Sequence, residues 1–280
     1  MARNMAGETS AQTLGGGSFY GSVRGRLERH HAIFTDLQHA SPRRLPSHAH
    51  ELAFFALLLD GSYGERYRHR DLQFGPFTIM FRPAGIPHQD EIGPRGVKFF
   101  EIELRPAWKQ RMADCSGLEL PHEECRGGEM LWLAMKLYRE MHRPESAVDL
   151  VAESLLSELI GATCRLSDGK FKDAPGWLGG VVEKLKTEFC THLTLEELGQ
   201  EADVHPVHLS RVFRRCIGEG VGEYVRRLRI RKACEQMLRP AATLADISFG
   251  LGFADQSHFT RAFRRITGMS PSAFRRIIRT

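Results

Sequence analysis

Three histidines in the first third of the chain have a type and spacing that could bind a ligand. His48 and His50 lie in the motif HAH, and His88 ends the segment PAGIPH about forty residues later. An imidazole nitrogen can coordinate zinc, iron or manganese, and it can also hydrogen-bond a small organic molecule. Either function requires a fold that brings the two segments together.

A second group of candidate residues is cationic and occurs twice in the last third of the chain. A shift of fifty residues aligns residues 208–218 with residues 258–268, and six of the eleven positions are identical. The identical pairs are His208 and His258, Arg211 and Arg261, Phe213 and Phe263, Arg214 and Arg264, Arg215 and Arg265, and Gly218 and Gly268. Two copies are too few for a solenoid, which needs at least about three repeats. We therefore predict a duplicated module.

Each copy contains the signals of two helices joined by a tight turn. Thr194 and Thr243 are each followed three residues later by an acidic residue, a pattern that predicts the start of a helix. Asp203 and Gly252 suit the left-handed turn that follows, because few other residues tolerate that conformation. Pro206 fits the first position of the next helix. Two helices and a tight turn within about twenty residues form a helix-turn-helix motif.

The second helix of each motif is expected to have one buried and one exposed face. The predicted buried residues are Leu209, Val212, Phe213, Phe259, Ala262 and Phe263. An α-helix fits the major groove of DNA, where an arginine side chain can donate hydrogen bonds to guanine. We therefore expect Arg211 and Arg261 to contact bases. The arginines one turn later are expected to contact phosphates. The predicted DNA-binding residues are Val207, His208, Arg211, Arg214, Arg215, Gln256, Ser257, His258, Arg261, Arg264 and Arg265. A single charged stripe is usually a solvated surface, but its duplication in two capped motifs favours DNA binding.

Residues 181–280 resemble the AraC/XylS family of transcription regulators. The segments LTLEELGQEADVHPVHLSRVFRRCIG and LADISFGLGFADQSHFTRAFRRITGMSPSAFRR are similar to that family's two helix-turn-helix motifs and C-terminal signature. The resemblance implies a linker helix at about residues 222–238 and two recognition helices in successive major-groove segments. Two residues depart from the pattern. His205 is a poor N-cap, and Gly250 lies inside a predicted helix at a cost of roughly 1 kcal/mol relative to alanine.

The segments with the three histidines resemble the two half-motifs of cupins, small β-barrels that are joined to many regulators of this family. The resemblance covers residues 45–104. A cupin metal site has three histidines and a glutamate, but Phe54 occupies the glutamate position here and Ile92 the last polar position. We therefore predict an effector-binding pocket formed by His48, His50, Phe54 and His88, without a metal or other cofactor. The three histidines alone are the alternative metal site, because catalytic zinc keeps three protein ligands.

Composition limits the classes of function. Hydrophobic residues make up 42% of the chain and charged residues 26%, as in a globular protein. The longest apolar run, residues 52–59, is shorter than the roughly 20 residues of a membrane helix, so we expect no membrane partner. Six cysteines without a CxxC motif predict reduced thiols and a cytoplasmic protein.

The charge is distributed unevenly along the chain. Residues 171–280 contain 18 Lys and Arg against 12 Asp and Glu, whereas residues 1–170 contain 21 against 22. A basic C-terminal region after a nearly neutral N-terminal one indicates a polyanionic partner. Together with the two motifs, it favours double-stranded DNA.

The sequence predicts an α+β protein. Runs of aromatic and branched residues separated by Asp-Gly and Gly-Pro pairs predict strands up to residue 104, and helical periodicity begins near residue 129. The expected regions are a disordered tail at 1–18, a cupin-like β-barrel that senses the effector at 19–110, a helical dimerisation and linker region at 111–170, a linker at 171–180, and an all-α domain with two helix-turn-helix motifs at 181–280.

These features together predict a cytoplasmic transcription regulator, an activator, that binds promoter DNA as a homodimer and responds to a small-molecule effector. RNA polymerase is a further expected partner, and we assign no catalytic residue. Two alternatives stay open. One is a metal-dependent cupin enzyme, such as a dioxygenase, fused to a DNA-binding domain, which predicts bound metal and turnover. The other is a constitutive DNA-binding protein whose barrel serves only dimerisation.

Overall fold

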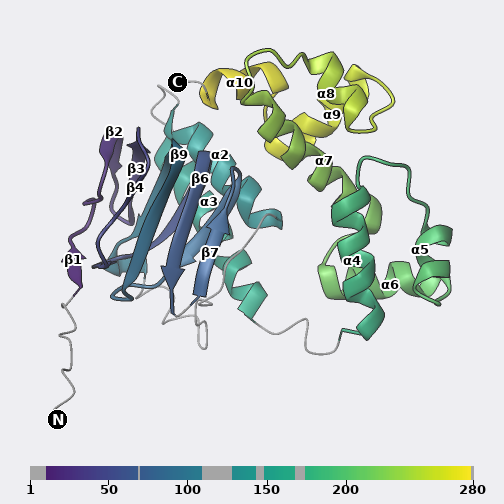
Figure 1. Ribbon diagram of the computed structural model, residues 1–280, viewed down its shortest axis with the longest axis horizontal. Helices are drawn as coiled ribbons and strands as arrows, with labels where there is room; N and C mark the ends of the chain where they lie inside the picture. The colour runs from purple at the N-terminus through teal and green to yellow at the C-terminus, as the bar shows by residue number, and fades with distance from the viewer. Residues whose placement is uncertain (1–10, 69, 109–127, 143–147, 168–173, 279–280) are drawn as a thin grey trace, which may run out of the picture. The chain divides into compact units, whose positions relative to one another are not determined.

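The computed structural model describes residues 11–68, 70–108, 128–142, 148–167 and 174–278. Within these residues the chain forms two compact units, a curled β-sheet and a group of helices (Figure 1). The α+β class predicted from the sequence is confirmed.

The N-terminal unit is one curled sheet. Its strands in the described part of the chain are β1 (Gln12–Leu14), β2 (Ser22–Glu28), β3 (Ala32–His39), β4 (Arg43–Arg44), β5 (His48–His50), β6 (Ala53–Tyr67), β7 (Arg70–Phe74), β8 (Thr78–Arg82) and β9 (His88–Leu104). Strand β9 is the central element, because it pairs antiparallel with β3, β4, β5 and β6. Its pairing with β6 runs from Ala53 opposite Leu104 to Tyr67 opposite His88.

The long strand β6 changes which of its residues face the interior of the sheet. Successive side chains of a strand point to opposite faces. In the first half of β6, Phe54 and Leu58 lie in the interior core, and after two register shifts Tyr63 lies in the same core. Gly61 allows this change, because it has a φ of 91° and a Cβ atom there would lie 2.1 Å from the carbonyl oxygen of Gly96.

The predicted disordered tail at 1–18 is wrong for its second half. Residues 12–14 form β1, which pairs in parallel with β5. The backbone N–H of Gly17 donates a 2.7 Å hydrogen bond to the buried carboxylate of Glu103 on β9. These long-range bonds offset the entropy lost when the segment is ordered, and local composition does not reveal them. Residues 1–10 lie outside the described residues.

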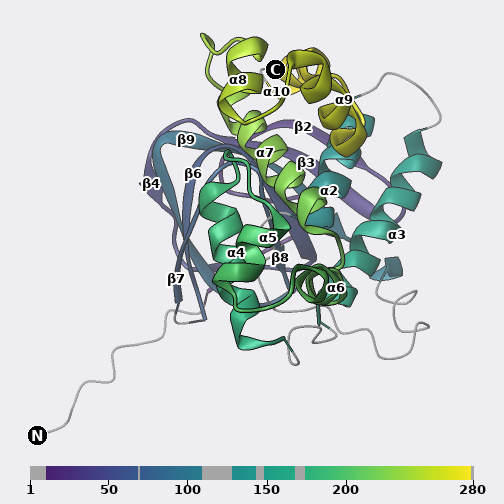
Figure 2. The same ribbon diagram turned by 90° about the vertical axis from the view of Figure 1, so that its right-hand side faces the viewer.

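The second unit is helical (Figure 2). Its described helices are α2 (Gly128–Met141), α3 (Val148–Ser167), α4 (Gly176–Glu188), α5 (Leu195–Glu201), α6 (Pro206–Ile217), α7 (Val221–Met237), α8 (Leu244–Gly250), α9 (Gln256–Thr267) and α10 (Pro271–Ile278). Helix α7 agrees closely with the linker helix that the family resemblance implied at about residues 222–238. The predicted stripes of α6 and α9 are buried, with each of the six residues at most 8% exposed.

The predicted linker at 171–180 is wrong in its second half, because α4 begins at Gly176. Leu178 of this helix is buried in the same core as Phe213 of α6. Burial of apolar side chains outweighs the low helix propensity of the three glycines in this segment. The helical domain predicted at 181–280 therefore begins about five residues earlier.

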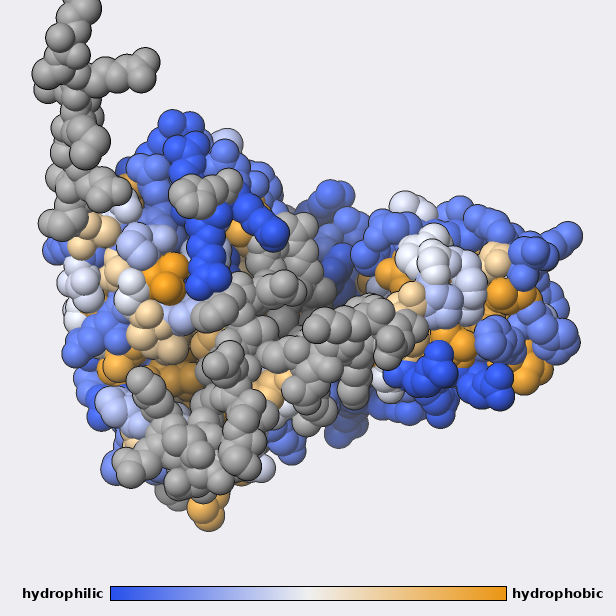
Figure 3. All heavy atoms as spheres, turned by 90° about the horizontal axis from the view of Figure 1, so that it is seen from below, coloured by the Kyte–Doolittle hydropathy of each residue, from blue (hydrophilic) through white to orange (hydrophobic). Residues whose placement is uncertain are grey.

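The surface is mainly hydrophilic on the face that Figure 3 presents, with smaller hydrophobic patches between the polar side chains. Among the residues that the structure describes, the large apolar side chains that stay exposed are Val23, Leu150, Val151, Val207 and Phe249. None of the helices that the structure describes combines the length and the apolar character needed to cross a membrane.

Candidate functional site

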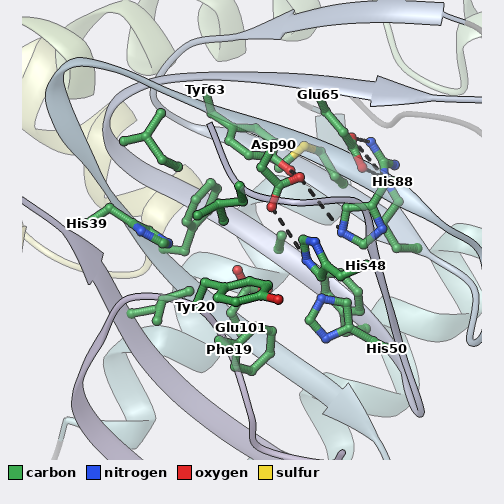
Figure 4. A pocket seen from close by; sticks show the side chains of 18 residues that line it. Phe19, Tyr20, His39, His48, His50, Tyr63, Glu65, His88, Asp90 and Glu101 are labelled. Carbon is green, nitrogen blue, oxygen red and sulfur yellow. Dashed lines mark hydrogen bonds and ion pairs between the residues drawn. The ribbon is translucent and has the colours of Figure 1, made fainter. Parts of the chain in front are cut away.

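The curled sheet brings the three predicted histidines into one buried cluster (Figure 4). His48 on β5 is the register partner of His88 on β9. Their ring centroids lie 4.4 Å apart, and the ring of His50 lies 5.2 Å from that of His48 and 5.4 Å from that of His88. All three residues are at most 5% exposed. Strand pairing therefore closes the separation of about forty residues between the two segments.

Backbone carbonyl groups orient two of the imidazoles. Nδ1 of His48 lies 3.0 Å from the carbonyl oxygen of Pro46, and Nδ1 of His88 lies 3.3 Å from that of Ile86. A carbonyl oxygen only accepts, so Nδ1 carries the proton in both rings and Nε2 keeps its lone pair. Burial lowers the pKa of His48. Burial and the two neighbouring histidines lower the pKa of His50 to about 3.

Asp90 lies beside the histidines, although no motif in the sequence pointed to it. Its Oδ2 lies 3.7 Å from Nε2 of His48, and its Oδ1 lies 3.8 Å from Nε2 of His88. The hydroxyl of Tyr63 donates a 2.7 Å hydrogen bond to Oδ1. Burial raises the pKa of Asp90, and the two histidines oppose that effect. A signal was available, because Asp90 follows His88 by two residues and that spacing puts both on one face of a strand.

Two more carboxylates line the same cavity. Glu65 is paired with buried Arg82, whose Nε donates a 2.8 Å hydrogen bond to Oε1 and whose Nη2 bonds Oε2. This pairing neutralises both charges. Glu101 has no hydrogen-bond partner at Oε2 within the described part of the chain. Burial, followed by repulsion from Glu103, raises the pKa of its carboxyl well above its ordinary value.

The cavity between these groups is small. Its volume is about 30 Å³, and apolar side chains such as Phe19, Phe54 and Phe99 form part of its wall. Pockets for drug-sized ligands usually have about 300–1,000 Å³, whereas roughly 15 Å³ holds one water molecule. Phe54, at the cupin glutamate position, lies against His50 with a ring distance of 4.6 Å. In this conformation the cavity has room for an ion with water or for a ligand of similar size.

The donors in this cavity fit a divalent transition metal. Ligand atoms of His48, His50 and His88 lie within 4.8 Å of one another, and those of Glu65, His88 and Asp90 form a second such group. Imidazole and carboxylate together suit zinc, iron and manganese. Metal-bound histidines usually donate their other ring N–H to a carbonyl or carboxylate, and His48 and His88 have this arrangement.

The first helix-turn-helix motif consists of α5 and α6. Oγ1 of Thr194 accepts a 3.1 Å hydrogen bond from the N–H of Glu197, and the Glu197 carboxylate accepts a 2.8 Å bond from the N–H of Thr194. These two reciprocal bonds form a capping box, so the helix start predicted from Thr194 is confirmed. Asp203 occupies the left-handed turn with a φ of 52°. His205, expected to be a poor N-cap, does cap α6, since its Nδ1 accepts a 3.3 Å hydrogen bond from the N–H of Val207.

The second motif, α8 and α9, is built in the same way. Oγ1 of Thr243 accepts a 3.1 Å hydrogen bond from the N–H of Asp246. Gly252 forms the left-handed turn with a φ of 72°. A carboxylate oxygen of Asp255 caps α9 by accepting a 2.6 Å hydrogen bond from the N–H of His258. Local signals in the sequence therefore fix both motifs.

The eleven predicted DNA-binding residues are all exposed on α6 and α9. Their exposure follows from the buried stripes, which fix the rotation of each helix about its axis. Nη2 of Arg211 lies 3.3 Å from Nδ1 of His208, so these two side chains share one exposed surface. Contact of these residues with DNA stays a prediction.

Comparison with known proteins identifies the family. Residues 198–277, which span α5 to α10, match a family model described as a helix-turn-helix domain. An AraC-like transcription regulator of Streptomyces antibioticus is 30% identical over 165 residues, which cover 56% of this chain and 53% of that protein. The HTH-type transcriptional regulator YobQ of Bacillus subtilis is 33% identical over 237 residues, which cover 82% of this chain and 88% of YobQ. The chain belongs to the AraC-like family of helix-turn-helix transcription regulators.

Coverage differs among the relatives of this AraC-like chain. It spans about half the length of two Streptomyces relatives, 53% and 54% respectively. Among solved structures, the C-terminal domain of AraT, a response regulator from Geobacillus stearothermophilus, is 26% identical and is similar to 38% of this chain and 88% of that domain, with a TM-score of 0.36. The matched family model covers both copies of the repeat, so the AraC-like resemblance seen in the sequence is confirmed.

Proposed function

We propose that this AraC-like chain regulates transcription by binding double-stranded DNA in a sequence-specific manner. The observation that carries the proposal is the pair of helices α6 and α9, each capped, each buried along one stripe and each exposing a cationic face. The major groove accepts an α-helix whose first turns contact base edges. Arg211 and Arg261 are assigned to bases, and the arginines one turn later are assigned to phosphates.

We propose further that the curled sheet senses an effector at His48, His50, Phe54 and His88. These side chains come from three strands, β5, β6 and β9, and meet at one buried cavity, as a binding site requires. The small volume of this cavity favours a compact effector. An effector that binds one arrangement of the protein better than another shifts the population towards that arrangement, in proportion to its differential affinity. The role is regulatory and not enzymatic.

The other assignments follow from family membership and from the exposed surface. We propose a homodimer formed through the helical region 111–170, because Leu150 and Val151 are exposed apolar residues on α3. The proposed limits of the sensor and of the DNA-binding domain are 11–110 and 176–280. The protein is assigned to the cytoplasm and to transcription activation, with RNA polymerase as a further partner.

Footprinting of the full-length protein on DNA fragments selected from a genomic library tests this function. We expect two protected segments about one helical turn, roughly 34 Å, apart on one face of the duplex. Affinity should fall steeply with salt concentration. Absence of binding at low salt by a folded protein would contradict the proposal, and one protected segment would show that a single motif reads DNA. Occupancy that never responds to small molecules from a cell extract would favour a constitutive DNA-binding protein.

A further inference from the structure

We propose that Asp90 completes a binding site for a divalent transition-metal ion in the curled sheet, with His48, His50 and His88 as nitrogen ligands. The cupin pattern has its carboxylate at the position that Phe54 occupies here. Asp90 comes instead from β9, two residues after His88. The metal site itself is argued from geometry and does not depend on the proposed sensor role. Only the assignment of the metal ion as the effector rests on that role.

The orientation of the imidazoles is the first argument. Carbonyl groups hold Nδ1 of His48 and His88, so both Nε2 lone pairs face the carboxylate of Asp90, at 3.7 and 3.8 Å. These distances are too long for hydrogen bonds, and lone pairs that face a carboxylate repel it. A cation placed between the three groups replaces this repulsion by attraction. The arrangement is therefore more stable with a bound cation than without one.

The second argument is a buried nitrogen atom without a partner. His50 is 3% exposed, and its Nδ1 has no hydrogen-bond partner among the residues that the structure describes. A buried polar atom in this state is destabilising unless a ligand satisfies it. The ligand atoms of the three histidines already lie within 4.8 Å of one another. A movement of about an ångström would bring them to zinc-nitrogen distances from one ion.

Charge and size favour a metal ion over an organic ligand. Arg82 already neutralises Glu65, which leaves Asp90 as the carboxylate beside the histidines that can balance a cation. Glu101 lines the same cavity, but it belongs to neither group of converging ligand atoms. The volume of about 30 Å³ accommodates an ion with water. Three imidazoles and one carboxylate are a donor set for zinc, iron or manganese.

Titration of the metal-free, full-length protein with Co²⁺, followed by displacement with Zn²⁺, tests the proposal. Cobalt is the probe because its visible absorption reports the ligands around it. We expect one Co²⁺ per chain, without the near-ultraviolet bands of cysteine ligands, and displacement by Zn²⁺. Asp90→Asn keeps the shape of the side chain and can still accept the hydrogen bond of Tyr63. It should weaken metal binding about 10- to 100-fold and change the cobalt spectrum.

Matched variants separate this site from general effects of charge. His50→Ala and His88→Ala should each remove tight metal binding. Asp71→Asn removes one carboxylate from an exposed position on β7 of the same sheet, where it pairs with Arg66, and should leave the affinity unchanged. If Asp90→Asn does not fold, as judged by circular dichroism, Asp90→Glu keeps the charge and should still change the cobalt spectrum.

Several results would overturn the proposal. They are a wild-type protein that binds neither ion at micromolar concentration, a cobalt spectrum with thiolate bands, and an Asp90 variant with wild-type affinity and spectrum. DNA binding is measured on the same metal-free samples. Intact DNA binding without metal binding contradicts the metal site alone, whereas intact metal binding without DNA binding contradicts the proposed regulatory function alone.

Discussion

Arg229 on α7 donates a 2.6 Å hydrogen bond from Nη1 to the carbonyl oxygen of Gly252, in the turn of the second helix-turn-helix motif. The same guanidinium donates to the carbonyl oxygens of Phe189 and Thr191, which follow α4, at 2.7 and 2.9 Å. It also lies 5.8 Å from the ring centroid of Phe253. The side chain of Arg229 therefore connects the turn of the second motif to the end of α4, the helix that packs against the first motif.

The first prediction concerns this connection. Arg229→Ala removes three hydrogen bonds to carbonyl oxygens, so the spacing of α6 and α9 should become less fixed. We expect about tenfold weaker binding to a duplex with both half-sites and a smaller change with one half-site, because a fixed geometry lowers the entropy lost on binding. Fluorescence anisotropy with both duplexes measures the difference.

Lys232→Ala is the matched control for this prediction. It removes a positive charge from the same helix at an exposed position, where the side chain pairs with Glu235. If both variants weaken the two duplexes equally, Arg229 contributes only charge and the positioning role is wrong.

The second prediction separates base contacts from phosphate contacts. Arg211→Ala and Arg261→Ala should each relax the base preference at their own half-site, at a cost of roughly 1–3 kcal/mol. Arg214→Ala should instead weaken all sequences by a similar factor and reduce the salt dependence of binding. Selection of bound duplexes from a randomised library, repeated for each variant, measures both effects. Unchanged base preference in the first two variants would assign specificity to other residues.

The helix-turn-helix motifs could be predicted from sequence because their signals are local. The capping box at Thr194 and the left-handed backbone conformation of Asp203 each depend on residues that are only a few positions away in the sequence. Because the sequence contains the motif twice, each copy independently predicted a helix-turn-helix motif. The hydrogen bonds of Arg229 were not predictable, because they join residues up to forty positions apart through tertiary packing.

The polar site in the sheet was predictable only in part. The resemblance of their two segments to cupin half-motifs was what predicted that His48, His50 and His88 form one cluster. Glu65 was missed because register shifts in β6 change which positions face inward, and alternation cannot be continued across them. Residues 97–104, VKFFEIEL, which form the end of β9, show the same limit in another form. Its alternation separates Glu101 from Phe100, but it does not reveal that both faces of the strand are buried.

The third prediction tests the glycines of the second motif. Gly250 ends α8, and a Cβ atom there would have no neighbour within 4 Å. Gly250→Ala should therefore raise the melting temperature by roughly 2 to 4 °C, because alanine favours a helix by up to about 1 kcal/mol. Gly252→Ala should lower it, because its φ is 72° and the added Cβ would lie 2.5 Å from the carbonyl oxygen of Cys190. Calorimetry measures the melting temperature of both variants. A higher melting temperature for Gly252→Ala would contradict this account of the turn.

The last prediction concerns the dependence of stability on pH. Burial raises the pKa of Glu103 from 4.5 to about 7, although the N–H of Gly17 and the charges of Arg26 and Arg105 oppose it and Glu51 reinforces it. Between these two values the folded protein keeps a proton that the unfolded chain releases, so stability should fall as the pH rises from about 4.5 to 7. Glu103→Gln removes this loss and can still accept the bond from Gly17. We expect the variant to be more stable than the wild type at pH 8, by no more than about 3 kcal/mol, and equally stable near pH 4.5. Glu91→Gln, at an exposed position of the same strand, should show no such difference. A Glu103→Gln protein whose melting temperature follows the wild type at every pH would show that this carboxylate is ionised at little cost in the folded state.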